Sequence, residues 1–201
     1  EQGESMQFTL NIGNNAVNTM QMVAVDSLPY DRDTAGSLFK GSCLVKSLTV
    51  MTPELLDKIT LYYTTKESER GKTSTVYSVN DFADSFVWQK LTVDPVTNTA
   101  MLPEGEFAPV AIAAVGQLPS QQTFKVDLTM ELPYGQVGDR VINRLSCGDL
   151  ETGSTVEVTG EPPYTGTDFS AKAWPVLAGA ACLVLLSVGG KMVCRRKRGS
   201  R

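Results

Sequence analysis

The ten residues Thr123-Phe-Lys-Val-Asp-Leu-Thr-Met-Glu-Leu132 alternate between polar and apolar side chains without interruption. A period of two residues is typical of a β-strand that buries one of its two sides. Pro133 has no backbone N–H to donate and is expected to end this strand. We therefore predict a strand over residues 123–132 with one side in the core. The predicted buried side chains are Phe124, Val126, Leu128, Met130 and Leu132.

Shorter apolar patterns occur on both sides of this stretch. Residues 6–12 also alternate strictly, and further strands are predicted at 20–25, 43–50, 59–64, 75–79, 86–93 and 110–115, with weaker patterns at 141–145 and 155–159. Helical signals in this part are limited to single turns near Thr52-Pro53-Glu54 and at residues 80–85. Many short strands separated by turn residues indicate an all-β fold, either an antiparallel jelly roll or a β-sandwich.

Composition divides the chain into four parts. Residues 1–148 are predicted to form the β domain, and residues 149–172, rich in Gly, Thr, Ser, Glu and Pro, a linker or stalk with room for one added strand. Residues 173–190 carry no charge. Residues 191–201 form a basic tail.

The uncharged segment 173–190 is predicted to form one hydrophobic helix that is membrane-active or spans a membrane. Its 18 residues would extend roughly 27 Å as a helix, near the lower limit for crossing a bilayer. Trp174 lies where an interfacial aromatic belongs, and the basic residues follow directly. The alternatives are a buried core helix, or a strand followed by a solvated tail. The side chains predicted to contact lipid are Trp174, Leu177, Leu183, Leu185 and Leu186.

The basic tail opposes the charge of the rest of the chain. The last eleven residues hold six cations and no acid, whereas the first 190 hold 12 basic and 22 acidic side chains, a net charge of −10. The tail could bind anionic lipid, contact nucleic-acid phosphates, or remain solvated, and the adjacent apolar segment favours lipid. Cys194, beside it, is a candidate for lipidation. The tail residues concerned are Lys191, Arg195, Arg196, Lys197 and Arg198.

Few residues point to catalysis. The chain has no histidine, which removes the commonest general base and metal ligand, and no nucleophile elbow, P-loop or dinucleotide-binding motif occurs. We therefore expect no enzymatic activity and no small-molecule substrate. Asp31 and Asp33 form the one metal hint, because an Asp-x-Asp pair suits Ca²⁺, but a turn stabilised by its own Asp side chains is the preferred interpretation of the pattern. No other cofactor is indicated.

The four cysteines are scattered and show no metal-site spacing. Sparse cysteines of this kind are commonly free thiols. A disulfide between Cys43 and Cys147 is the alternative, and it requires an oxidising compartment.

One part of the chain resembles a known family. Ala108-Pro-Val-Ala-Ile-Ala-Ala-Val115, a polar turn and the strand at 123–132 look like the last two strands of the jelly-roll shell domain in tombusvirus-, sobemovirus- and nodavirus-like coat proteins. The resemblance covers roughly a quarter of the chain. It implies that Asp31-Arg-Asp33 would suit an acidic, sometimes Ca²⁺-binding, interface between subunits. Those coat proteins usually carry a basic arm at the N-terminus, whereas residues 1–20 here are not basic, and the apolar C-terminal segment is more like a lytic peptide.

Two functions follow from these observations. The first is a virion structural protein that assembles with copies of itself or sister proteins, contacts lipid through residues 173–201, and could bind nucleic acid only through its tail. The second is a single-pass cell-surface protein of the plasma membrane, with a β-sandwich that binds a protein partner and a cytoplasmic C-terminus. The missing Asn-x-Ser/Thr sequon and the lack of a signal sequence in residues 1–20 favour the first.

Overall fold

The computed structural model describes residues 4–40, 43–103, 108–132, 135–158 and 187–192. Within these ranges the chain is mostly β, with four short 3₁₀ helices. The strands are β1 (Glu4–Gly13), β2 (Met20–Ser27), β3 (Leu44–Val50), β4 (Ile59–Thr64), β5 (Gln89–Lys90), β6 (Thr99–Met101), β7 (Ala111–Leu118), β8 (Thr123–Leu132), β9 (Arg140–Cys147), β10 (Leu150–Glu157) and β11 (Ser187–Met192). The 3₁₀ helices are η1 (Pro53–Leu55), η2 (Glu67–Glu69), η3 (Ser74–Val76) and η4 (Val79–Ala83).

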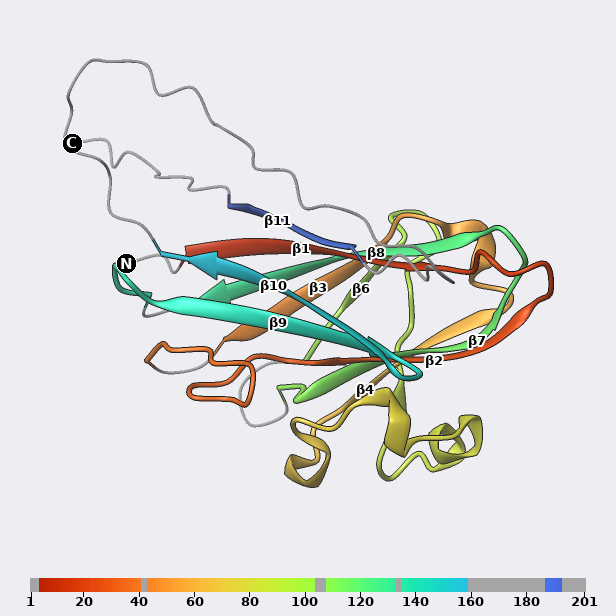
Figure 1. The fold of residues 1–201 in the computed structure, drawn as a ribbon, viewed down its shortest axis with the longest axis horizontal. Helices are drawn as coiled ribbons and strands as arrows, with labels where there is room; N and C mark the ends of the chain where they lie inside the picture. Colours follow the sequence, from red (N-terminus) through yellow and green to blue (C-terminus); the bar gives the residue numbers. More distant parts are fainter. Residues whose placement is uncertain (1–3, 41–42, 104–107, 133–134, 159–186, 193–201) are drawn as a thin grey trace, which may run out of the picture.

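The strands form two antiparallel sheets that face each other as a β-sandwich (Figure 1). The first sheet has the order β11-β1-β8-β3-β6, and the second has the order β10-β9-β2-β7-β4-β5. Among the first eight strands, β1 pairs with β8, β2 with β7, β3 with β6 and β4 with β5. This nested pairing is the strand order of a double-sheet jelly roll, which explains how strands distant in sequence become neighbours.

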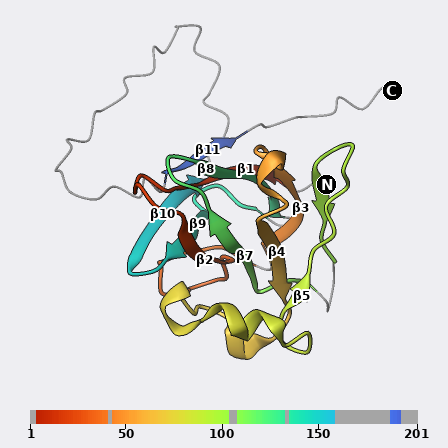
Figure 2. The ribbon, with the colours of Figure 1, turned by 90° about the vertical axis from the view of Figure 1, so that its right-hand side faces the viewer.

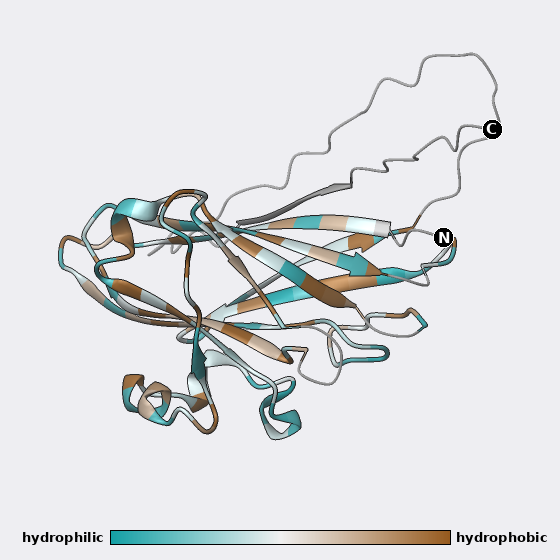
Figure 3. Cartoon of the chain, turned by 180° about the vertical axis from the view of Figure 1, so that it is seen from behind, coloured by the Kyte–Doolittle hydropathy of each residue, from teal (hydrophilic) through white to brown (hydrophobic). Residues whose placement is uncertain are grey.

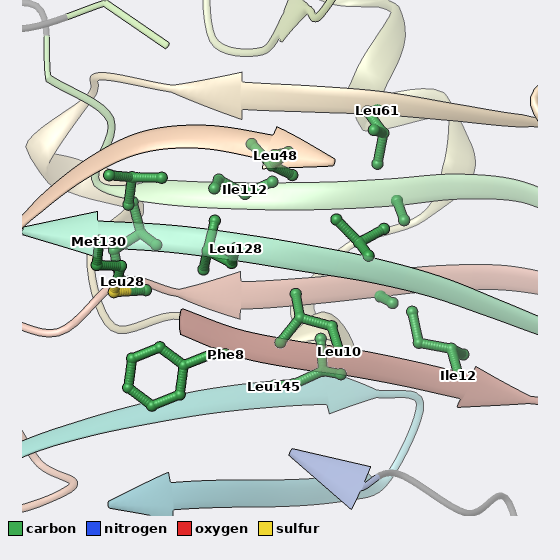
Figure 4. Close-up of a cluster of buried hydrophobic side chains, with 14 of the residues drawn as sticks. Phe8, Leu10, Ile12, Leu28, Leu48, Leu61, Ile112, Leu128, Met130 and Leu145 are labelled. Carbon is green, nitrogen blue, oxygen red and sulfur yellow. The ribbon is translucent and has the colours of Figure 1, made fainter. Parts of the chain in front are cut away.

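The core lies between the two sheets and follows the predicted alternation of β8. Its five apolar side chains are all buried, whereas Lys125 is exposed and Asp127 and Thr129 are half-buried. Phe8, Leu10 and Leu128 of the first sheet meet Ile112 and Leu145 of the second (Figure 4). Complete burial of a Leu or Phe side chain is worth about 1.5–3 kcal/mol, so this core is the main source of stability.

The second sheet is also covered on its outer side. Val25, Ala111, Ala113 and Val115 pack there with Phe82 and Trp88 in a cluster separate from the main core. The chain from η2 to η4, yellow in Figure 2, supplies this third layer beneath the second sheet. Ser146 Oγ helps to attach it, because this oxygen accepts a hydrogen bond from the Ser74 backbone N–H at 2.8 Å and donates to the Val25 carbonyl at 3.1 Å.

The predicted strand at 75–79 is wrong, and that at 86–93 is too long. Residues 74–76 and 79–83 form η3 and η4, and only Gln89 and Lys90 form a strand. Tyr77, Val87 and Trp88 of these two stretches pack across the outer side of the second sheet, and this does not require pairing as strands. The predicted turn at Thr52-Pro53-Glu54 is confirmed as η1, whereas the short strand β6 was not predicted.

The sheet continues beyond the predicted end of the β domain. β10 pairs with β9 along eight residues, from Leu150 opposite Cys147 to Glu157 opposite Arg140. This strand occupies part of the range 149–172, for which a linker with room for one strand was predicted. The remainder of that range, from residue 159 onward, lies outside the described residues.

The last described strand belongs to the C-terminal part. β11 pairs antiparallel with β1, with Met6 opposite Met192 and Asn11 opposite Ser187. Residues 187–190 are therefore extended, in contrast to the helix predicted for 173–190, because their backbone groups complete the outer edge of β1. Residues 173–186 lie outside the described residues. Among the residues that the structure does describe, no helix is long and apolar enough to cross a bilayer.

Candidate functional site

The loop between β2 and β3 contains the predicted calcium residues. Asp33 accepts hydrogen bonds from the Ser37 backbone N–H at 2.9 Å and from Ser37 Oγ at 2.8 Å, through its two different oxygens. Asp31 Oδ1 accepts from the Phe39 backbone N–H at 3.2 Å. Arg32 between them has a φ of 58°, in the left-handed region. Both carboxylates thus organise the loop that contains them.

The predicted calcium site stays a prediction. Across the described ranges, no three His, Cys, Asp or Glu side chains come together as a metal-binding group. Asp31 and Asp33 could therefore hold Ca²⁺ only with further oxygen ligands, such as backbone carbonyls or groups from another subunit.

A small cleft lies beside this loop and is lined in part by Tyr30, Lys72 and Arg144. Lys72 Nζ lies 3.0 Å from Glu69 Oε1, and Arg144 Nε lies 2.8 Å from Glu151 Oε1. Both cations are therefore paired. The cleft offers about 10 Å³, which is room for one water molecule.

Glu69 connects this cleft to the outer aromatic layer. Its Oε2 accepts hydrogen bonds from Tyr77 Oη at 2.7 Å and from Lys72 Nζ at 3.0 Å. Burial alone would raise the pKa of Glu69, but the hydrogen bonds from Tyr77, Lys72 and Ser68 bring it below its usual value. Burial, together with the hydrogen bond to Glu69, raises the pKa of Tyr77. Both groups therefore keep their ordinary charge states at neutral pH and stabilise the outer layer.

The two cysteines of the body are free thiols, so the alternative of a Cys43–Cys147 disulfide is not found. Cys43 Sγ lies 3.7 Å from Met130 Sδ and packs against that thioether. Burial, and then the nearby Asp26 carboxylate, raise the pKa of Cys43 to about 12, and burial raises the pKa of Cys147. Since the thiolate is the reactive form, both thiols are poor nucleophiles.

Of the site residues predicted in the C-terminal part, the structure describes only Lys191. Its Cα lies opposite that of Gln7 in the pairing of β11 with β1. The remaining ones fall outside the described residues, and their roles stay predictions. They are Trp174, Leu177, Leu183, Leu185, Leu186, Cys194, Arg195, Arg196, Lys197 and Arg198.

Sequence reasoning missed a buried polar pair between the sheets. Asp26 of β2 and Asn143 of β9 are 2% and 0% exposed, and Asn143 Nδ2 donates a hydrogen bond to Asp26 Oδ2 at 2.7 Å. Burial, opposed by this hydrogen bond, raises the pKa of Asp26 to about 7. The signal was available in the sequence. Asp26 continues the inward series of Met22 and Ala24, and Asn143 stands between Val141 and Leu145.

Comparisons of this chain with protein-family models, with curated proteins and with solved structures gave no match. The candidate functions therefore depend on the strand order, on the C-terminal segment and on the buried and exposed side chains described above.

Proposed function

We propose that this chain is a structural protein of a virion. Its jelly-roll domain assembles with copies of itself or with sister proteins, and the C-terminal segment, helical over most of residues 173–190, interacts with lipid. The observation that carries this proposal is the nested pairing of β1–β8, β2–β7, β3–β6 and β4–β5. Viral capsid subunits are one of the main classes of protein built on this strand order, beside lectins and cupins.

The resemblance noted in the sequence agrees with this strand order. The stretches at 108–115 and 123–132, which look like the last two strands of a viral shell domain, correspond to β7 and β8. These are the seventh and eighth strands of the nested set, and each lies centrally in its own sheet. Pattern and position therefore support the same architecture.

Exposed apolar side chains on the outer layer support contacts with neighbouring copies. Val76, Val79 and Phe86 lie on the chain that covers the second sheet and are 60%, 39% and 74% exposed. Brown segments on this layer are visible in Figure 3. Scattered apolar residues are normal on a surface, whereas contiguous apolar patches mark interaction sites, and we propose that these side chains contribute to such a patch.

The position of β11 favours the virion over a cell-surface protein. A single-pass span would need all of residues 173–190 in the bilayer. With residues 187–190 paired to β1, only 14 residues remain, or about 21 Å of helix against a hydrocarbon core of about 30 Å. A membrane-active segment held by the β domain fits this arrangement better than a permanent anchor.

The deciding experiment is sizing of the full chain by light scattering and electron microscopy, with and without detergent. We expect large regular assemblies that persist without detergent. If calcium bridges subunits through Asp31 and Asp33, a chelator should shrink them, and the variant Asp31→Asn/Asp33→Asn should not respond to the chelator. A strictly monomeric species well above micromolar concentration would exclude assembly.

Lipid binding is tested separately by liposome flotation. The full chain should float with the vesicles, and a chain ending at Ala171 should remain in the soluble fraction, because it lacks the apolar segment. Equal behaviour of the two would contradict the proposed membrane role.

The alternative is a single-pass cell-surface protein with a cytoplasmic C-terminus. The apolar stretch 173–190 between Trp174 and the basic tail favours it, since this is the arrangement of a stop-transfer segment. A cleaved signal peptide encoded upstream of Glu1 would support this alternative, whereas a polyprotein junction there would support the virion protein.

A further inference from the structure

The pair formed by Asp26 and Asn143 has two unsatisfied atoms. Their single hydrogen bond uses Asn143 Nδ2 and Asp26 Oδ2, and it leaves Asp26 Oδ1 and Asn143 Oδ1 buried without a partner. Both remaining atoms are acceptors when Asp26 is ionised. A buried acceptor without a donor is costly, and more so if it carries charge. The ionised pair is therefore badly matched to its surroundings.

Apart from the Asn143 amide, the described surroundings offer no compensation for a negative charge. A small cavity beside Asp26, about 20 Å³, is lined otherwise by apolar side chains, including Leu10 of β1, Leu48 of β3, Leu61 of β4 and Ile112 of β7. Val126 of β8 and Leu145 of β9 also line this cavity. The one other titratable group described as interacting with Asp26 is the Cys43 thiol, which carries no positive charge. An ionised carboxylate here would be an uncompensated charge in the core.

We propose that Asp26 is held as a neutral carboxylic acid, with its proton on Oδ1 and donated to Asn143 Oδ1. The two side chains then form an acid–amide pair joined by two hydrogen bonds across β2 and β9. Loss of this proton weakens the sandwich, so the pair makes the fold less stable as pH rises toward neutral. One proton satisfies both orphaned oxygens at once.

The direction of the pH effect follows from the two states of the chain. In the folded protein the pKa of Asp26 is about 7, and in the unfolded chain it returns to its ordinary value of 3.8. Between pH 3.8 and about 7 the folded state holds one more proton than the unfolded chain, so the free energy of unfolding falls as pH rises. The stabilisation that the protonated Asp26 contributes is lost above pH 7. The chain has no histidine, so no other side chain with an ordinary pKa titrates between pH 5 and 8.

Equilibrium unfolding of the full chain in urea, kept in a neutral detergent, tests the proposal between pH 5 and 8. The unfolding constant of the wild type should rise roughly 100-fold over this range, as a pKa change from 3.8 to about 7 requires. The matched variant is Asp26→Asn, whose amide can make the same two hydrogen bonds but cannot ionise. Its unfolding constant should change less than about 3-fold, and at pH 8 it should be the more stable protein.

Carbon-13 NMR of the Asp26 carboxyl group gives a second measurement on the unmodified protein. The signal should titrate near pH 7. Titration near pH 4, or parallel pH profiles for the wild type and Asp26→Asn, would overturn the proposal. If Asp26→Asn does not fold, the NMR titration of the wild type decides alone.

Discussion

The strands β7 and β8 are consecutive in the chain, yet their burial differs. β8, in the first sheet, buries every second side chain, and the side chains between are half-buried or exposed. β7, in the second sheet, buries five residues in succession, from Ala111 to Val115. The difference arises because, within the described residues, the first sheet packs on one side only, whereas the second sheet is covered by the first sheet on its inner side and by the aromatic layer on its outer side. The apolar pattern of a strand therefore reports how many of its faces are covered.

The open face of the first sheet is polar and internally bonded. Asp127 of β8 accepts hydrogen bonds from Thr9 Oγ1 at 2.7 Å and from Gln7 Nε2 at 3.1 Å, both on β1. Lys46 Nζ of β3 lies 3.1 Å from Glu131 Oε2 of β8, which is an ion pair. On the outer face of the second sheet, rings take the place of such bonds: Phe82 and Trp88 have centroids 4.9 Å apart. The two faces are stabilised by different interactions and should respond differently to substitution.

The largest effect is expected for Trp88→Ala. This ring is 1% exposed and contacts Phe82 and Tyr77, so its removal leaves a large cavity and should lower the free energy of unfolding by about 3–5 kcal/mol. Urea unfolding measures this. Phe86→Ala, two residues earlier but 74% exposed, is the control and should cost less than about 1 kcal/mol. Similar costs for the two variants would mean that the outer layer is not a true second core.

A somewhat smaller effect is expected for Leu128→Ala in the main core. Its side chain is fully buried on the inner side of β8, and the substitution should cost about 2–5 kcal/mol. Thr129→Ala, on the opposite side of the same strand, should cost less than about 1 kcal/mol. Thermal and urea unfolding of both variants test the register directly. A larger loss for Thr129→Ala than for Leu128→Ala would reverse the assignment of the two faces.

The smallest effect is expected for Asp127→Ala on the open face. The substitution removes two hydrogen bonds to β1 that are partly exposed to solvent, so the loss should be about 1 kcal/mol. Combining it with Thr9→Val in a double-mutant cycle isolates the shorter bond. A coupling energy near zero would show that this polar face contributes solubility but little stability.

The sequence was most informative where one rule decided the structure. Alternation predicted β8 and the apolar side of β1, and Thr52-Pro53 predicted the turn η1. Residues 75–79 and 86–93 were harder, because apolar and aromatic residues in a short run suit a strand and a covering loop equally. β6 has only three residues, too few for a periodic pattern. Local patterns do not indicate which surface a segment will cover.

The candidate site residues also divide into those that the sequence predicted and one that only the structure revealed. Asp31 and Asp33 were chosen from their spacing alone, and the structure places them in a loop where each accepts a hydrogen bond from a backbone N–H. Asp26 was not predicted as a site residue, because a single Asp near the end of a strand is ordinary. Its importance depends on Asn143, which is 117 residues away in the chain.

By itself, the sequence determined the β class, the inward side of the main strands, the acidic body and the basic tail. These properties depend on neighbours within a few residues, through the two-residue repeat of extended chain and the charges of individual side chains. Only the tertiary structure decided the nested strand order, the aromatic layer over the second sheet, the pairing of β11 with β1 and the burial of Asp26. Each of these joins segments far apart in the chain, where the free energy depends on which surfaces meet and exclude water.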